Sequence, residues 1–399
     1  MNDIILTEKQ KEAVELCVAR YKAHKAYTCI AGLAGSGKTT TVKFIIQALG
    51  LTEAEVSYIA FTGKASLVLR ERGCPNAMTA HKLLYKAFRN KDGTYSYIPK
   101  DELDGPYKVI VVDEVSMLDE AIWKLLLSHH IHVIALGDPC QLPSISKSNT
   151  VLDHPHIFLD QIMRQAQESE IIRLSMDIRN GKPLSLYSGK EVQVIDKSQM
   201  VSGMLLWADQ IIVAKNDTRQ FYNNLMRDYL FGADHPDGPV EGDKVIALHN
   251  DYKCLDTLGE PLVNGAIGKI SNIKYKINTT KVRSKKYTPH NIIPEFMYAN
   301  FTPDYSGDDE IFEQISMDKK LYETGSPTIT RDNFRKVPGS MQPHEFDYGY
   351  AVTAWKMQGS SAPKVLVIEE DFPWNAEEHR KFLYTCITRA EKKLVIVRR

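Results

Sequence analysis

Short apolar runs alternate with amphipathic stretches along the first third of the chain. Four runs predict buried β-strands, at residues 27–31, 56–61, 109–112 and 132–136. Strands that alternate with helical stretches indicate a parallel sheet with crossover helices between the strands. Ligands of such sheets bind beyond the carboxyl ends of the strands, so candidate chemistry is expected there.

The periodicity changes after residue 144, where a second α/β domain is expected. Helical patterns at residues 171–178 and 218–229 accompany strand-like runs at 210–214 and 364–368. Between about residues 240 and 338 the sequence pattern differs again, with short β-type runs, charged stretches and many turn residues. This segment predicts a small β-rich insertion.

Composition excludes several classes of protein but does not identify a function. The 399 residues are 43% hydrophobic and 25% charged, which is typical of a soluble globular protein and not of a disordered, collagenous or membrane protein. Fifty basic and fifty acidic residues cancel, so any nucleic-acid site must be a local basic patch. Six scattered cysteines without a CxxC pair predict reduced thiols and a cytoplasmic setting, and no signal peptide or membrane-spanning run is expected.

A glycine-rich segment follows the first predicted strand. Residues 32–39 read Gly-Leu-Ala-Gly-Ser-Gly-Lys-Thr and open a helical stretch, which is the context that a P-loop requires. Backbone N–H groups would face the β-phosphate of ATP, Lys38 would supply a point charge, and the Thr39 hydroxyl would bind Mg²⁺. The residues expected to contact nucleotide here are Gly35, Ser36, Gly37, Lys38, Thr39 and Thr40.

Two adjacent carboxylates, Asp113 and Glu114, end the predicted strand at residues 109–112. We expect Asp113 to hold Mg²⁺ through water and Glu114 to polarise the attacking water, because a carboxylate tied to the metal cannot also act as the base. Taken alone, the pair could instead be a solvated acidic helix start.

Gln10 has two interpretations. Thr7-Glu8-Lys9-Gln10 matches a capping box, and local sequence favours that role over contact with the adenine edge. The resemblance described next reverses this preference and adds Gln10 to the nucleotide contacts.

Further motifs follow in a fixed order along essentially the whole chain. They occupy residues 60–65, 79–84, 113–117, 137–143, 163–165, 242–245, 263–265, 353–359 and 384–390. This order resembles that of superfamily 1 helicases. The Asp-Glu-x-Ser-Met and Asn-Gly elements resemble the group of RecD, TraI and phage Dda, which moves 5′ to 3′ along single-stranded DNA.

The resemblance implies an α/β fold of two RecA-like P-loop motor domains with parallel sheets. The first would span residues 1–155, with a hairpin insertion at 84–106. The second would comprise residues 156–240 and 339–399, interrupted by a β-rich, SH3-like insertion at 241–338.

Carried over by motif, Gln141 resembles the glutamine that senses the γ-phosphate, and Arg164 and Arg389 resemble two arginines that reach it from the second domain. A guanidinium stabilises the charge of a phosphoryl transition state, by roughly 10³–10⁵ in rate. The same resemblance places Gln358 and Gly359 at the nucleotide. As isolated residues, the arginines would more commonly be surface salt-bridge partners.

Other motif residues fall where the family contacts the DNA backbone. Hydroxyl and ammonium groups suit phosphates and carry no base code. Each of these residues alone could be a helix cap or an exposed lysine, and Asn264-Gly265 reads locally as a tight turn. The DNA contacts implied are Thr62, Lys64, His81, Phe88, Asn264, Thr353, Trp355 and Lys356.

Trp355 departs from the family, which usually has His before the Lys of this motif. Stacking on a base, worth roughly 1–3 kcal/mol, and a place in the core are equally supported.

A β-hairpin is predicted at Asn90-Lys91-Asp92-Gly93-Thr94, because an Asp-Gly turn lies there between two arms that carry aromatic residues. We interpret this hairpin as a pin that separates the DNA strands. The alternatives are a surface loop and a continued helix.

The predicted function is therefore an ATP- and Mg²⁺-dependent DNA helicase that acts on single-stranded and forked duplex DNA. A translocase that strips proteins without unwinding, or a motor subunit of a larger recombination complex, remains the alternative. We expect a monomer with no membrane contact. Candidate protein partners are single-strand-binding, replication and recombination proteins.

Overall fold

The structure is a computed structural model in which the chain divides into two compact units. It describes residues 5–71, 73–74, 76–89, 95–143, 150–162, 168–257, 261–276, 296–304, 311–318, 321–322, 343–370 and 375–399. The first unit comprises Met1–Tyr85, Pro99–Arg219 and Val352–Arg399, and the second comprises Lys86–Ile98 and Gln220–Ala351.

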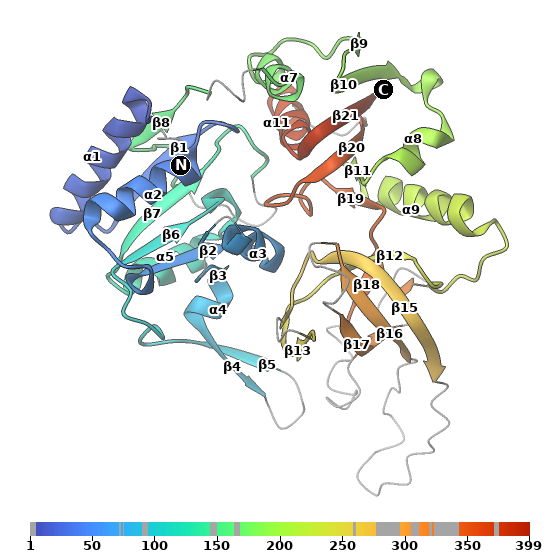
Figure 1. The fold of residues 1–399 in the computed structure, drawn as a ribbon, viewed down its shortest axis with the longest axis horizontal. Coiled ribbons are helices and arrows are strands. Elements are labelled where there is room, and N and C mark those ends of the chain that lie inside the picture. Colours follow the sequence, from blue (N-terminus) through green and yellow to red (C-terminus); the bar gives the residue numbers. More distant parts are fainter. Residues whose placement is uncertain are drawn as a thin grey trace, which may run out of the picture. The chain divides into compact units, whose positions relative to one another are not determined.

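A six-stranded sheet forms the first half of the first unit, in the order β3-β2-β6-β7-β1-β8 (Figure 1). Every neighbouring pair is parallel. The strands are β1 (Tyr27–Gly32), β2 (Val56–Ala60), β3 (Met78–Thr79), β6 (Val109–Val112), β7 (His132–Gly137) and β8 (Ile157–Leu159). The four strands predicted from the sequence are β1, β2, β6 and β7, and their parallel pairing is confirmed.

Helices cover both faces of this sheet because successive side chains of a strand point to opposite faces. Val109 and Val111 of β6 pack in the hydrophobic cluster that includes α1 and α2, whereas Ile110 and Val112 pack in the cluster that includes α4 and α5. The helices of this half are α1 (Glu8–Lys22), α2 (Lys38–Leu49), α3 (Gly63–Glu71), α4 (Ala80–Leu84) and α5 (Glu120–Ser128), with 3-10 turns η1 (Glu53–Glu55) and η2 (Val115–Met117).

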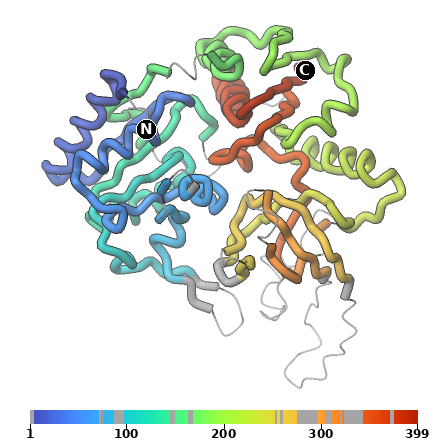
Figure 2. The backbone as a smooth tube through the Cα atoms, in the orientation of Figure 1, coloured from blue at the N-terminus to red at the C-terminus, as the bar shows by residue number. Residues whose placement is uncertain are grey.

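A second six-stranded sheet has the order β19-β11-β20-β21-β10-β9. The pairs β11–β20, β20–β21 and β21–β10 are parallel. Figure 2 shows the red carboxyl-terminal segment returning beside the green segment that holds β10. The strands are β9 (Tyr187–Ser188), β10 (Val192–Asp196), β11 (Gln210–Val213), β19 (Ala351–Thr353), β20 (Ala362–Ile368) and β21 (Ala390–Arg398).

The two helices that the sequence predicts in this region are α7 and α9. The helices of this half are α7 (Glu170–Arg179), α8 (Ser202–Trp207) and α11 (Ala376–Ile387), with a 3-10 turn η3 (Lys197–Gln199), whereas α9 (Asn216–Phe231) runs from the first unit into the second. Among the described residues, no helix is both long enough and apolar enough to cross a membrane.

The second unit is built around a five-stranded antiparallel sheet of order β17-β16-β15-β12-β18. Phe301 lies at its core, with its ring centroid 5.1 Å from that of Phe346 and 5.9 Å from that of Phe312. Two of the short β-type runs expected between residues 240 and 338 are β12 and β15, whereas residues 281–286, which are rich in Lys and Arg, lie outside the described residues. The strands are β12 (Lys244–Ala247), β13 (Asp251–Leu255), β14 (Pro261–Leu262), β15 (Ile267–Lys276), β16 (Phe296–Pro303), β17 (Phe312–Asp318) and β18 (Phe346–Tyr348).

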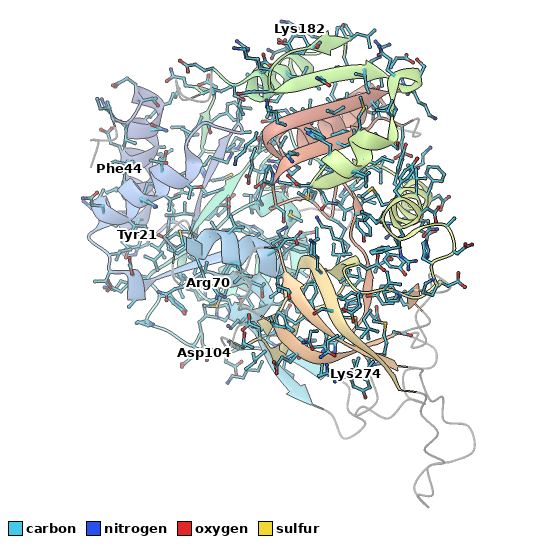
Figure 3. All side chains as sticks on the ribbon, turned by 45° about the vertical axis from the view of Figure 1, so that its right-hand side comes forward. Tyr21, Phe44, Arg70, Asp104, Lys182 and Lys274 are labelled. Atoms are coloured by element: carbon cyan, nitrogen blue, oxygen red, sulfur yellow. The ribbon has the colours of Figure 1, made fainter. Side chains whose placement is uncertain are left out.

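The predicted hairpin is present as a two-stranded sheet of β4 (Tyr85–Arg89) and β5 (Tyr95–Pro99). Its Asp-Gly turn lies outside the described residues. At its base, the Lys100 N–H donates to the Leu84 carbonyl at 2.8 Å. The buried Lys100 ammonium donates to the Lys82 carbonyl at 3.0 Å and to the Asp104 carboxylate at 2.6 Å, so the residue that follows β5 is fixed to α4; Figure 3 labels Asp104.

A buried ion pair organises the second unit. The Arg227 side chain is 2% exposed, and its Nε lies 3.2 Å from Oδ2 of Asp243, which is fully buried. The guanidinium also donates to the carbonyls of Pro236 and Gly238 and stacks 4.3 Å from the ring centroid of Tyr348. Every charge of the pair thus has a hydrogen-bonding partner, as burial of a charge requires.

Replacing Arg227 should strongly destabilise the second unit. Arg227→Met leaves Asp243 buried without its cation, so we expect a loss of about 3–5 kcal/mol in the free energy of unfolding. This loss in the free energy of unfolding is measured by urea unfolding, with amide exchange in β12 and β18 as the probe of the second unit. The control is Lys124→Met, which removes an exposed pair with Glu120 and should cost less than about 1 kcal/mol. Equal stability of the two variants would contradict the prediction.

Candidate nucleotide site

The loop between β1 and α2 has the backbone conformation that binding of phosphate needs. Gly35 and Gly37 adopt φ values of 76° and 78°, in the left-handed region that favours glycine. Helix α2 begins at Lys38, directly after Gly37. The first N–H groups of a helix have no intrahelical partner, so those of Lys38 and Thr39 are available to an anion.

Lys38 closes this loop in the structure. Its Nζ donates to the carbonyls of Gly32 at 2.7 Å and Leu33 at 3.1 Å. These bonds hold the ammonium group beside the loop. When a phosphate binds, the ammonium group can replace its neutral carbonyl partners with charged phosphate oxygens, which accept stronger hydrogen bonds.

One cavity of about 500 Å³ brings most of the predicted nucleotide residues together. It combines residues of the P-loop, the two carboxylates after β6, Gln141 from the segment after β7, and Arg389 from the segment after α11. The cavity is lined by Leu33, Ala34, Gly35, Gly37, Lys38, Thr39, Thr40, Lys43, Asp113, Glu114, Gln141 and Arg389.

The two carboxylates are fixed differently. The Asp113 N–H donates to the Ile59 carbonyl at 2.9 Å, which ties Asp113 to the edge of the sheet next to β2. The Asp113 Oδ1 accepts the N–H of Glu114 at 3.1 Å. Glu114 has φ 51° and ψ 52°, a left-handed conformation that is uncommon for a residue with a side chain and that turns the chain sharply after the strand.

The environment of Glu114 favours its protonated form. Burial raises the pKa of its carboxyl group, the adjacent Asp113 raises it further, and Arg389 and Lys38 act in the opposite direction. A raised pKa makes this carboxylate a stronger base than an exposed glutamate.

Gln141 and Arg389 approach Glu114 from two different segments. The Nε2 of Gln141 lies 3.5 Å from Oε1 of Glu114, and its own Oε1 is buried without a partner among the described residues. Arg389 donates to the carbonyls of Thr385 at 3.2 Å and Ser360 at 3.3 Å, which hold the side chain at the cavity. The predicted arginine Arg164 lies outside the described residues.

Gln10 has both of its predicted local contacts. Its Oε1 accepts the Thr7 N–H at 2.9 Å and the Thr7 hydroxyl accepts the Gln10 N–H, so the capping box is confirmed. Its Nε2 donates to the Ser36 carbonyl of the P-loop at 3.0 Å. Gln10 and Ser36 are buried and do not line the cavity, so their contact with nucleotide remains a prediction.

Gln358 and Gly359 also lie away from the lining of the cavity. The Nε2 of Gln358 donates to the Leu142 carbonyl at 2.6 Å. A Cβ added to Gly359 would lie 3.0 Å from Cβ of Ala65 and 3.9 Å from Oγ1 of Thr62, beside a segment predicted to contact DNA. The structure therefore gives these two residues contacts with motifs of the first sheet, and a nucleotide contact remains a prediction.

Trp355 is partly buried and is not among the fully buried residues of the core. Its indole N–H donates to the Pro143 carbonyl at 3.1 Å. Stacking on a base remains a prediction.

The other predicted DNA residues have local roles as well. The Thr62 hydroxyl accepts the Ala65 N–H at 3.1 Å at the start of α3. The His81 ring stacks on Tyr85 with centroids 5.5 Å apart, and burial lowers the pKa of His81. Lys64 and Thr353 are half-buried and Lys356 is exposed.

Asn264 and Phe88 complete the predicted set. The Asn264 N–H donates to Oδ1 of Asn250 at 2.8 Å, and Gly265 has φ 85°, so the tight turn read from the sequence is confirmed. The side chain of Phe88 lies outside the described residues.

Sequence reasoning gave no role to several residues at the site. Lys43 lines the cavity, and its signal was its position one helical turn beyond the P-loop on α2. Tyr384 and Thr385 bond to Asp138 and to the Leu142 N–H, at 2.7 and 2.8 Å. Tyr384, Thr385, Asp138 and Leu142 belong to motifs that the sequence identified. Their contacts could not be read from those motifs, because each contact joins two segments that lie far apart in the sequence.

Two family models match the chain. One described as an AAA domain matches residues 5–203, and one described as a UvrD-like helicase C-terminal domain matches residues 348–397. The ATP-dependent DNA helicase Dda of Enterobacteria phage T4 is 25% identical over 353 residues, which cover 80% of this chain and 79% of Dda. The ATP-dependent RecD2 DNA helicase of Deinococcus radiodurans is 31% identical over 160 residues, 38% of this chain and 22% of RecD2.

Solved structures show the same fold. The Pif1 helicase from Bacteroides in complex with ADP-AlF3 and single-stranded DNA has a TM-score of 0.52 and 16% identity, covering 99% of this chain and 92% of that one. Pif1 from Candida albicans also has a TM-score of 0.52, with 99% and 94% covered. The predicted α/β fold with two RecA-like domains is confirmed. With an amino-terminal and a carboxyl-terminal segment both matched, the chain is similar to superfamily 1 helicases, and the comparisons support the group that includes Dda and RecD.

Proposed function

We propose that this protein is an ATP-dependent DNA helicase that moves 5′ to 3′ along single-stranded DNA and unwinds duplexes. One observation carries the ATPase part of the proposal. A single cavity combines the P-loop, the pair Asp113 and Glu114, and Arg389, which follows a helix packed on the other sheet. The DNA part rests on the similarity to the family and on the motif residues that the family uses to contact DNA.

ATP is the substrate that fits this cavity. The left-handed glycines expose backbone N–H groups, Lys38 and Lys43 bring positive charge, and Gln141 offers a buried oxygen without a partner among the described residues. The residues that would hold Mg²⁺ are Thr39 and Asp113, and the ion would neutralise charge on the phosphates. Hydroxyl and carboxylate oxygens are the ligands that Mg²⁺ prefers.

Glu114 is the proposed general base. Its carboxylate takes a proton from the attacking water, and burial raises its pKa toward the working pH. Gln141 lies within reach of this carboxylate and orients the same water. Arg389, with Arg164 as its proposed partner, stabilises the charge that spreads over the transferred phosphoryl group.

The proposed DNA path uses motif residues that do not line the nucleotide cavity. Thr62, Lys64 and His81 follow strands of the first sheet, whereas Thr353 ends β19 of the second sheet and Lys356 follows it. These groups bind phosphates without reading bases, as a motor indifferent to sequence requires. Trp355 lies between Thr353 and Lys356 and is half-exposed, which suits stacking on a base. Asn264 and Phe88 are proposed contacts from the two insertions.

We propose the hairpin of β4 and β5 as the pin that separates the strands. Tyr97 and Ile98 are 49% and 53% exposed, although two-stranded hairpins with exposed apolar side chains are marginal in water. The base is braced by the bonds of Lys100 to Leu84 and Lys82. A braced, apolar projection has the properties of a wedge, because it can stack against the last base pair without yielding.

Replacing Glu114 should stop hydrolysis while binding persists. We expect Glu114→Gln to lower ATP turnover at saturating single-stranded DNA by roughly 10²–10⁴, because the amide cannot accept the proton. Lys38→Ala should lose turnover together with affinity for a non-hydrolysable ATP analogue. Because burial raises the pKa of Glu114, parental turnover should fall with decreasing pH above the ordinary glutamate range near about 4.3. Near-parental turnover of Glu114→Gln would remove Glu114 as the base.

Strand separation on tailed duplexes tests the motor function itself. We expect ATP-dependent unwinding of a duplex with a 5′ single-stranded tail and none with a 3′ tail, because the family moves 5′ to 3′. Glu114→Gln is the inactive control. Unwinding only from the 3′ tail would overturn the polarity, and ATPase stimulated by DNA without unwinding of either substrate would identify a translocase.

Changing the pin should separate unwinding from hydrolysis. We expect Tyr97→Ser with Ile98→Ser, or replacement of residues 88–97 by a short Gly-Ser turn, to slow unwinding of a 5′-tailed duplex by roughly tenfold or more. ATPase stimulated by single-stranded DNA should be retained, since the pin makes no part of the cavity. Tyr229→Ser, at a tyrosine with a similar exposed fraction of 47%, is the control. A pin variant that unwinds at the parental rate would show that this hairpin is not the wedge.

A further inference from the structure

The hydroxyl group of Tyr384 joins two loops of the nucleotide site. Tyr384 lies on α11 and is 1% exposed. Its hydroxyl donates to Oδ2 of Asp138 at 2.7 Å and accepts the N–H of Ala34, in the P-loop, at 3.1 Å. Burial raises the pKa of this phenol far above its usual value, so the group stays protonated and can donate and accept at once.

Asp138 connects the Tyr384 hydroxyl to the turn that carries Gln141. The other carboxylate oxygen, Oδ1, accepts the N–H of Cys140 at 3.0 Å, and the Asp138 carbonyl accepts the N–H of Gln141 at 3.2 Å. Asp138 is itself 1% exposed. The turn that presents Gln141 toward Glu114 therefore depends on a buried carboxylate, which needs all of its partners.

The same helix end positions Arg389. The Thr388 N–H donates to the Tyr384 carbonyl at 3.1 Å, and Nε of Arg389 donates to the Thr385 carbonyl at 3.2 Å. The Thr385 hydroxyl accepts the Leu142 N–H at 2.8 Å. The position of α11 against residues 138–142 thus fixes where Arg389 enters the cavity.

We propose that Tyr384 is a positioning residue for ATP hydrolysis. Its hydroxyl holds the P-loop at Ala34 and the turn at Asp138 in one arrangement, and through α11 it sets Arg389 against the same site. Tyr384 does not line the cavity and acts only through these groups. The inference rests on the proposed ATPase function and adds a residue that couples three of its parts.

Tyr350 provides a closely matched control. Its hydroxyl donates to Oδ1 of Asp243 at 2.9 Å and accepts the Lys244 N–H at 3.0 Å, so it bridges a buried carboxylate and a backbone N–H in the same way. Tyr350 belongs to the second unit and has no part in the cavity. Phenylalanine at either position removes one oxygen and leaves the same two kinds of group unpaired.

Steady-state kinetics of Tyr384→Phe and Tyr350→Phe compare the two sites. We expect similar losses of thermal stability, but a fall of roughly tenfold in kcat at saturating single-stranded DNA for Tyr384→Phe alone. The KM for ATP should change by less than about threefold, because the phenol does not contact the substrate. A kcat for Tyr384→Phe equal to that of Tyr350→Phe would overturn the proposal.

A double-mutant cycle tests whether Tyr384 acts through Arg389. In an Arg389→Ala background, Tyr384→Phe should lower kcat by much less than it does in the parent, since the arginine that it positions is absent. Equal, additive effects would contradict this route.

Amide exchange decides the case independently of hydrolysis. We expect Tyr384→Phe, and not Tyr350→Phe, to accelerate exchange at Ala34 and Cys140, whose N–H groups depend on the phenol or on Asp138. Unchanged exchange at both positions would overturn the positioning role. If the parent protein does not hydrolyse ATP, the proposed function is wrong, and the exchange result still decides what Tyr384 holds.

Discussion

The carboxyl edge of the first parallel sheet is the constraint on which the site depends. Because β1, β6 and β7 run in the same direction, the P-loop, Asp113 and the turn at Asp138 all emerge at one edge. The segments after β6 and β1 are also bonded to neighbouring strands, through the Asp113 N–H to the Ile59 carbonyl and the Leu33 N–H to the Leu159 carbonyl. An antiparallel neighbour would send its loop to the opposite edge, and the cavity would lose one of its walls.

This edge by itself supplies only part of the site. It provides the P-loop, Glu114 as the proposed base and Gln141, but the guanidinium of Arg389 comes from the segment between α11 and β21 of the second sheet. Arg389 donates there to the neutral carbonyls of Thr385 and Ser360. Phosphate oxygens would form stronger, charge-assisted bonds with this guanidinium than carbonyls do.

The sequence predicted most of this arrangement because short-range patterns encode it. Strand runs, the glycine turn and the paired carboxylates are local, and β1, β2, β6 and β7 begin where their apolar runs begin. The contacts of Tyr384 and Gln358 could not be predicted, since each joins positions more than 200 residues apart in the chain. Gln10 could be predicted only in part. Its capping box follows from the local sequence, whereas its bond to the Ser36 carbonyl depends on the tertiary structure.

The segment after β7 receives contacts from both candidate sites. Residues 138–142 bond to Tyr384 and Thr385, beside the nucleotide cavity, whereas Leu142 and Pro143 accept bonds from Gln358 and Trp355, beside the proposed DNA path. Gln141 lies between these two sets of contacts and faces Glu114. We propose that this segment couples hydrolysis to DNA contact, because a displacement of α11 would act on the same short segment whose carbonyls hold Trp355 and Gln358.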